Sequence, residues 1–178
     1  METNSKSNNK KQFWKLSRKE RTIALVLLSG LLVGAWLPER LIVATSDSLD
    51  HRVFFKVPVD TNKIELGDYL LFKLDDAHEA TFIRKGLGDN DVLIKKVGCV
   101  PGETLTKDAE KTFYCHQTKL GTALLKDNQG NKLPVFMFTG PIPEDCYYMM
   151  GTNPRSFDSR YFGLIHGNDF IHKAIPLW

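Results

Sequence analysis

Long hydrophobic runs are almost absent from this chain of 178 residues. Only residues 22–38, TIALVLLSGLLVGAWLP, lack charge for long enough to cross a bilayer as a helix, which takes roughly 17–25 residues. A polytopic membrane protein is therefore excluded. Hydrophobic residues make up 42% and charged residues 25% of the chain, so a collagen, a long coiled coil and a wholly disordered protein are excluded as well.

The motifs of several enzyme classes and metal sites are also missing. The chain has no GxSxG elbow, no HExxH, no glycine-rich phosphate loop and no GxGxxG. Its five histidines are scattered, with no two of them four residues apart. A CxxC pair is absent, so a thiol oxidoreductase or a structural zinc site has no support. No metal ion and no organic cofactor is expected.

Cysteine is scarce, with three residues in the whole chain: Cys99, Cys115 and Cys146. An oxidising compartment would allow one disulfide and leave one thiol over. A Cys115–Cys146 disulfide is predicted, because Cys99 lies inside the most apolar of the predicted strands. Three unpaired, buried thiols are the alternative.

The net charge of +3 is unevenly distributed. Residues 1–21 carry a net charge of +5, and the remaining 157 residues carry −2. The main domain is therefore slightly acidic, and no nucleic-acid partner is expected for it. The basic flank predicts a cytoplasmic tail over residues 1–21 and a transmembrane anchor over 22–38, with residues 39–178 across the membrane.

Two other interpretations of residues 22–38 are a cleaved signal peptide and a buried core helix. The apolar stretch is slightly long for a signal peptide, whose apolar region covers about 7–15 residues. The small-x-small sequence Ala44-Thr45-Ser46 also comes late, after the charged Glu39 and Arg40. A core helix is disfavoured by the flanking charge and by the absence of a polar face.

Residues 39–178 show little helical periodicity. Short apolar runs recur instead, interrupted by Gly, Pro, Asp and Asn, and Lys126–Asn131 has the composition of a hairpin turn. The pattern predicts a mainly β domain of about 140 residues, large enough for a hydrophobic core. The runs cover residues 52–57, 68–74, 91–100, 132–138, 146–151 and 169–178.

Three segments of this domain contain residues suited to catalysis. In residues 44–54, Ser46 and Ser48 are two apart, and in an extended chain their hydroxyls would point the same way. A polar linker is the plainer interpretation of this segment. A Ser-His-Asp triad stays open from the residues alone, although His51, three residues from Ser48, is weak support for it.

The second segment, residues 91–103, places Lys95 and Lys96 inside an apolar run. Strand alternation predicts that one of the two points toward the core, where loss of hydration lowers the pKa of an amine. Such a neutral lysine can act as a general base for a serine. The alternative is a pair of lysines that protects a sheet edge.

The third segment, residues 150–165, is dense in small, polar and aromatic residues. Asp158 and Arg160 are two residues apart and Ser156 is close by. A tight loop with a surface ion pair, which would contribute little to stability, is the plainer interpretation.

Together these segments resemble the signal peptidase I superfamily, and in particular its TraF-type branch from bacterial conjugation systems. Ser46-Asp47-Ser48-Leu49 fills the family's Ser-x-Ser box. The lysine box is matched by residues 94–103, IKKVGCVPGE, and the last box by residues 151–163, GTNPRSFDSRYFG. The three boxes occur in the family's order behind an apolar anchor.

The resemblance implies a fold and a set of roles. It implies a signal-peptidase-like antiparallel β catalytic domain behind one N-terminal transmembrane helix. Counting back six residues from Pro101 selects Lys95 as the general base, and Ser48 becomes the nucleophile. The Ser48 backbone N–H and the Ser46 hydroxyl become the oxyanion donors. In the last box, Ser156 would hydrogen-bond the lysine, with Asp158 and Arg160 as supports.

Departures from the family's boxes accompany the matches. Leu49 replaces the usual Met, Thr152 replaces an Asp, and the serine of the last box is displaced by one residue. The segment from about residue 104 to 138 is too short for the large accessory domain of some signal peptidases. These features favour a compact, specialised enzyme over a housekeeping one.

The resemblance also implies a place and a substrate. The place is the bacterial inner membrane, crossed once, with the catalytic domain in the periplasm. The partners are the lipid bilayer, a protein substrate such as a propilin or another exported preprotein, and other conjugation proteins. Hydrolysis and cyclisation of the product are both open. The alternatives are a housekeeping signal peptidase I and a non-catalytic, membrane-anchored assembly protein.

Overall fold

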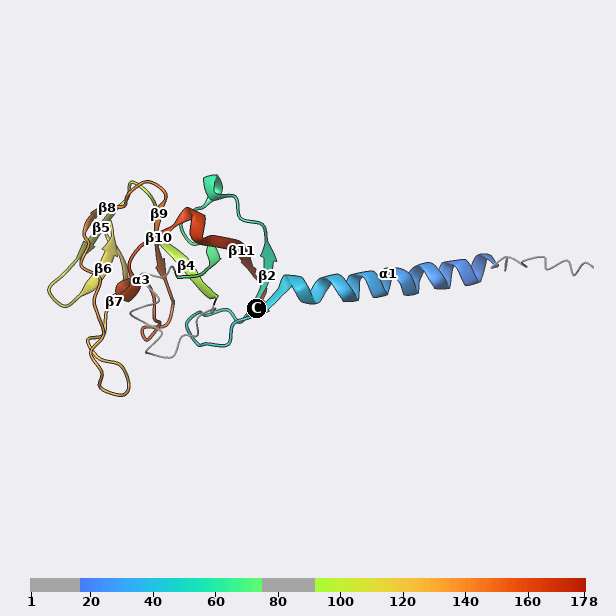
Figure 1. Cartoon of the computed structure of the whole chain (residues 1–178), viewed down its shortest axis with the longest axis horizontal. Coiled ribbons are helices and arrows are strands. Elements are labelled where there is room, and N and C mark those ends of the chain that lie inside the picture. Colours follow the sequence, from blue (N-terminus) through green and yellow to red (C-terminus); the bar gives the residue numbers. More distant parts are fainter. Residues whose placement is uncertain (1–16, 75–91) are drawn as a thin grey trace, which may run out of the picture. The chain divides into compact units, whose positions relative to one another are not determined.

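The computed structural model describes residues 17–74 and 92–178 (Figure 1). It divides the chain into two compact units, residues 1–39 and 40–178, which are described separately. In the first unit, helix α1 (Arg18–Arg40) contains the whole of the predicted span 22–38 and begins four residues before it. The helix is long and apolar enough to cross a membrane.

The second unit is built mostly from antiparallel strands. Its seven-stranded sheet has the order β1-β2-β11-β3-β4-β9-β10, and its four-stranded sheet has the order β7-β6-β5-β8. The first sheet consists of β1 (Leu41–Val43), β2 (Val53–Val57), β3 (Tyr69–Phe72), β4 (Leu93–Cys99), β9 (Cys146–Met150), β10 (Ile165–His166) and β11 (Phe170–Pro176).

The second sheet consists of β5 (Thr104–Lys107), β6 (Thr112–Cys115), β7 (Thr118–Thr122) and β8 (Gly140–Pro141). Short helical segments lie between the strands: η1 (Thr61–Lys63), α3 (Ser159–Phe162) and η3 (Gly167–Asp169). The expectation of a mainly β, antiparallel domain is confirmed.

Three clusters of buried side chains form the core. One gathers around Leu70, Phe72 and Val97 on one face of the large sheet. Another, around Phe54 and Leu71, covers the opposite face of the same strands. The third, around Leu105 and Tyr148, joins the two sheets. Burial of apolar surface of this kind is the main stabilising contribution to such a domain.

Five of the six predicted apolar runs contain strands, but residues 132–138 do not. Pro134 has no N–H to donate to a ladder. The backbone here makes scattered bonds instead of a ladder, among them those from Leu133 N–H to Leu125 O and from Phe136 N–H to Arg160 O. The preceding hairpin turn does form: Lys126 bridges to Lys132, and the Asp127 carboxylate accepts the N–H groups of Gln129 and Asn131.

The predicted Cys115–Cys146 disulfide is wrong. Cys99 and Cys115 are bonded instead, with their Cα atoms 5.6 Å apart, and Cys146 is a buried free thiol. Cys99 does lie in an apolar strand, as expected, but it is the last residue of β4. At this position Cys99 faces strand β6 of the other sheet within the core cluster that the two sheets share. A buried cysteine can therefore form a disulfide with Cys115, and its burial was no reason to exclude it.

Candidate active site

Strand β4 carries Lys95 into the interior. Its neighbours β3 and β9 pair with it on either side, and Lys95 stands opposite Leu70. Alternation along the strand turns Lys95 and Val97 to the same buried face, whereas Lys96 points the other way and stays partly exposed. Lys95 is only 3% exposed, so one of the two lysines does point inward, as the apolar pattern predicted.

The environment of Lys95 shifts its acidity. Burial lowers the pKa of Lys95 to about 8; the negative charge of Asp158 opposes this shift and the positive charge of Arg160 adds to it. The Lys95 Nζ donates a hydrogen bond to Ser156 Oγ over 3.0 Å. A substantial fraction of neutral amine is therefore present slightly above neutral pH.

The two serines of the first box lie in the loop between β1 and β2. The chain bends here rather than running extended, and the Oγ atoms of Ser46 and Ser48 are 2.9 Å apart in a hydrogen bond. Leu49 is buried against the cluster around Phe54 and holds the loop down. The Ser48 carbonyl accepts the Asn153 N–H over 3.2 Å, which connects the first box to the last.

Gly151 makes this contact between the boxes possible. A β-carbon at position 151 would overlap the Ser156 hydroxyl and would lie 2.6 Å from the Ser48 carbonyl oxygen. The Gly151 N–H is itself fixed by the Asp158 carboxylate over 2.9 Å. The serine loop and the Lys95–Ser156 pair are therefore adjacent because residue 151 has no side chain.

Asp158 and Arg160 form a fully buried ion pair at the start of α3. Arg160 Nε and Nη2 donate to the two Asp158 oxygens over 2.7 and 2.8 Å. The same guanidinium donates to the carbonyls of Pro154, Ser156 and Thr122. The pair thus ties the loop 151–158 to itself and to β7, and it is not the surface ion pair of the plainer interpretation.

A cavity of about 1160 Å³ opens beside these groups. Ser46, Ser48 and Lys95 all line it, together with apolar side chains such as Leu71 and Phe157. Ser156, Asp158 and Arg160 do not line it and lie behind Lys95 in the protein. Among the described residues, the Ser48 hydroxyl bonds to Ser46 and the Lys95 amine bonds to Ser156, with no hydrogen bond between Ser48 and Lys95.

Four polar members of the cavity wall match no position of the family's boxes. Lys56 comes from β2, His172 from β11 and Lys126 from the hairpin turn, and Arg155 lies inside the last box. The sequence carries no local signal that Lys56 and His172 meet, because the pairing of β2 with β11 brings them together.

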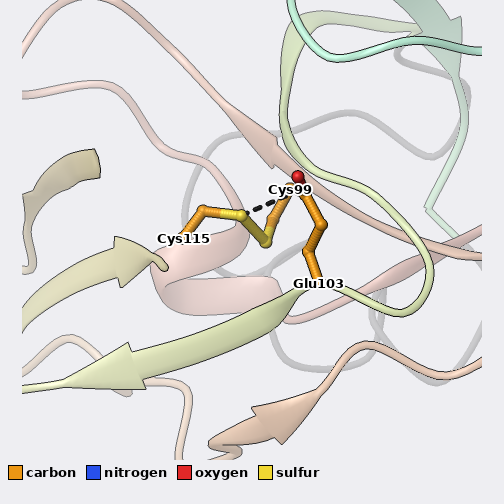
Figure 2. Close-up of side chains that lie close together, drawn as sticks. All are labelled: Cys99, Glu103 and Cys115. Atoms are coloured by element: carbon orange, nitrogen blue, oxygen red, sulfur yellow. Dashed lines mark hydrogen bonds between the residues drawn. A yellow bond between two sulfur atoms is a disulfide. The ribbon is translucent and has the colours of Figure 1, made fainter. Parts of the chain in front are cut away.

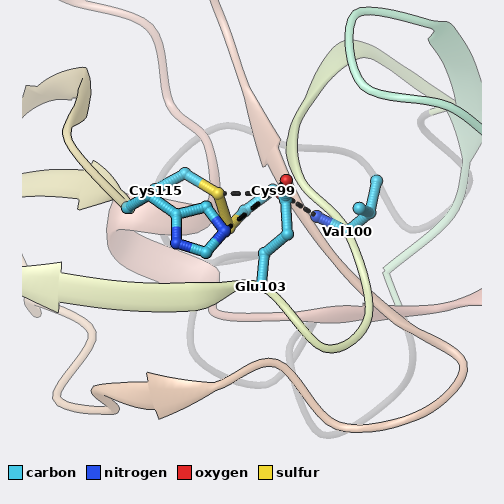
Figure 3. Close-up of a disulfide and its surroundings, with 5 residues drawn as sticks. Cys99, Val100, Glu103 and Cys115 are labelled. Carbon is cyan, nitrogen blue, oxygen red and sulfur yellow. Dashed lines mark hydrogen bonds and ion pairs between the residues drawn. A yellow bond between two sulfur atoms is a disulfide. The ribbon is translucent and has the colours of Figure 1, made fainter.

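Among the described residues, one group of potential metal-ligating side chains lies close together: Cys99, Glu103 and Cys115 (Figure 2). Glu103 Oε2 lies 2.9 Å from Cys115 Sγ and accepts the Val100 N–H over 3.0 Å (Figure 3). Both sulfurs are consumed by the disulfide, so neither is available as a thiolate ligand. In the oxidised protein this group is therefore not a metal site.

Comparison with known proteins adds a family to this geometry. The signal peptidase I of Enterococcus faecalis V583, known from a crystal structure, is 21% identical and has a TM-score of 0.37; the match covers 65% of this chain and 97% of that one. No curated protein sequence matches. The family model described as signal peptidase, peptidase S26, matches residues 20–178, which is most of the chain. The chain therefore belongs to the peptidase S26 family of signal peptidases.

Proposed function

We propose that this protein is a membrane-anchored serine endopeptidase that cleaves leader segments of exported proteins through Ser48 and Lys95. Membership of the peptidase S26 family implies serine endopeptidase activity on a protein substrate. The assignment of these two residues, and of a propilin from a conjugative transfer system as the substrate, is our own. The preference for a propilin rests on the resemblance to the TraF-type branch.

One observation carries the assignment of the base. Lys95 is almost fully buried, its pKa is lowered to about 8, and it lines the same cavity as the Ser48 hydroxyl. A buried amine with a depressed pKa is suited to accept the proton of a serine. Ser156, which accepts the hydrogen bond of Lys95, would orient the amine.

The chemistry follows from these positions. Neutral Lys95 takes the proton of Ser48, and the Ser48 oxygen attacks a substrate carbonyl that follows small residues. The Ser48 N–H and the Ser46 hydroxyl stabilise the oxyanion; the loss of one such donor typically costs about 10²–10³ in rate. Lys95 then protonates the leaving amine. Water resolves the acyl-enzyme to an acid, whereas the substrate's own amino terminus would give a cyclic product.

The anchor would hold this site at a membrane surface. An apolar N-terminal helix and the family together indicate membrane anchoring. In our proposal the helix crosses the bacterial inner membrane with residues 1–21 in the cytoplasm, because the basic flank lies on that side. The peptidase domain then faces the periplasm, where leader segments emerge.

The proposal is tested by co-expressing a candidate propilin with the wild type and with Ser48→Ala, Lys95→Met and Lys96→Met. Ser48→Ala and Lys95→Met should reduce processing by about 10³-fold or more, since nucleophile and base act as a unit. Lys96→Met is the matched control and should process normally. Membrane insertion and protein level are checked for each variant, and the product mass separates hydrolysis from cyclisation.

Normal processing by both Ser48→Ala and Lys95→Met would refute the catalytic assignment and favour the non-catalytic assembly role. Loss in Ser48→Ala alone would keep the nucleophile and reject Lys95 as the base. Rescue of a general secretion defect by the wild type, without propilin processing, would favour the housekeeping alternative.

A further inference from the structure

Most of the charged side chains among the described residues of the cavity wall are cations. Besides Lys95, the described residues that line it include the cations Lys56, Lys126 and Arg155, together with His172. They come from four separate segments of the chain and meet only in the folded domain. Among the described residues, neither Lys56 nor Arg155 forms a salt bridge.

The one carboxylate among the described wall residues is already engaged. Asp127 accepts the backbone N–H groups of Gln129 and Asn131, and its second oxygen accepts the Asn131 side-chain amide. These bonds hold the hairpin turn. The Asp127 charge is therefore engaged in local structure.

His172, on the same wall, lies close to two of the positive charges of this region. Burial lowers the pKa of His172, and the positive charges of Lys56 and Arg40 lower it further. Lys56 and Arg40 are therefore close enough to act on the imidazole, at the side of the cavity where β2 and β11 run together.

We propose that the cavity beside Ser48 selects substrates with an acidic side chain near the cleaved bond, which Lys56 and Arg155 recognise. The inference rests on the proposed function and narrows its substrate class. A carboxylate near either cation would gain attraction in a cleft with limited solvent, where charges interact more strongly than on an open surface. Arg155 adjoins Ser156, whose hydroxyl accepts the hydrogen bond of the proposed base Lys95, so recognition takes place near that base.

The test uses quenched fluorescent peptides with small residues before the cleaved bond. A parent peptide carries Gln at the flanking positions, and its relatives replace one Gln at a time by Glu. The full-length protein in detergent micelles is assayed for kcat/KM. At one or more positions Glu should be preferred over Gln by about three- to tenfold, and the preference should fall as salt screens the charges.

Lys56→Gln and Arg155→Gln should each lower the Glu-to-Gln ratio toward one. Lys119→Gln, an exposed lysine on β7 outside the cavity wall, is the matched control and should leave the ratio at its wild-type value. Equal cleavage of all peptides by the wild type would overturn the inference while leaving the proposed function intact. Failure to cleave any peptide or propilin would count against the proposed function itself.

Anionic lipid is the competing ligand for these cations. Wild type and Lys56→Gln are therefore compared for activity in micelles with and without phosphatidylglycerol, using the Gln peptide. If Lys56→Gln abolishes a lipid effect but leaves the Glu-to-Gln ratio unchanged, the cations serve the lipid and the inference is overturned. If the ratio falls and the lipid effect persists, the inference is supported.

Discussion

Lys95 shows how one side chain acquires a chemical property from its position. A lysine on the surface keeps its proton through the physiological range, because its ordinary pKa is about 10.4. On the central strand β4 it is buried, and its pKa falls to about 8. Lys96 is one residue further along the same strand, on the other face, and remains partly exposed. Strand alternation alone separates the two environments.

This acidity predicts a pH dependence for the proposed activity. The base works only when neutral, so kcat/KM should rise with pH through about 8. Near pH 7 about a tenth of Lys95 would be neutral and near pH 9 about nine-tenths, which predicts roughly a tenfold rise in kcat/KM. Initial rates on a neutral peptide across this range provide the measurement. A flat or falling profile in a protein shown to stay folded would contradict the role of Lys95.

Asp158 and Arg160 show how a buried ion pair can hold a loop in place. Each would be costly to bury alone, and together they satisfy each other and four backbone groups around the loop 151–158. Removing one partner of such a buried pair typically destabilises a protein by about 3–5 kcal/mol, because the other charge stays buried. The pair therefore fixes the loop that carries Ser156.

At the scale of elements, the site depends on how closely β9 and the serine loop approach. Gly151→Ala should remove most activity, because the added β-carbon meets the Ser156 hydroxyl and the Ser48 carbonyl, and the backbone carbonyl cannot swing away. Gly98→Ala on β4 is the matched control, since its β-carbon meets only the side chains of Met150 and Leu120 and no backbone atom. Peptide cleavage and circular dichroism of both variants provide the measurement. Equal activity of the two variants would show that the close contact of Gly151 with Ser48 and Ser156 is not needed for activity.

The elements differ in how far the sequence predicted them. Strands β2, β3, β4, β9 and β11 fall within runs that the apolar pattern identified, because burial leaves a local signature. Residues 132–138 have the same composition but stay irregular, since Pro134 prevents a ladder. The disulfide was mispredicted for a related reason: the partner of Cys99 is set by the packing of two sheets, which no short pattern encodes.

The candidate site was predictable to a similar degree. The resemblance to the signal peptidase family selected Ser48, Lys95 and Ser156 as candidates, and the Lys95–Ser156 hydrogen bond joins two of them across 61 positions of the sequence. The cationic side of the cavity was not predicted. Lys56 and His172 become neighbours only because β11 pairs with β2, and a contact between such distant strands depends on the whole topology.

At the scale of the whole domain, the Cys99–Cys115 disulfide joins the two sheets. It closes a loop of 16 residues, for which restriction of the unfolded chain corresponds to about 3 kcal/mol. Cys99→Ser should lower the free energy of unfolding by that amount, and Cys146→Ser, at the free thiol, should lower it by less. Urea unfolding in micelles, with thiol counting before and after reduction, provides the measurement. Equal effects of the two substitutions would argue against the Cys99–Cys115 bond.

Strand β11 connects the two parts of the large sheet that carry the candidate site. Residues 170–176 lie between β2, which follows the serine loop, and β3, which pairs with the strand of Lys95. Lys173 of β11 also binds Asp68 at the start of β3 over 2.7 Å. Without residues 170–176, no strand would lie between β2 and β3, and the serine loop and the strand of Lys95 would lose their connection. In the function we propose, docking of β11 is therefore a prerequisite for bringing Ser48 and Lys95 to one cavity.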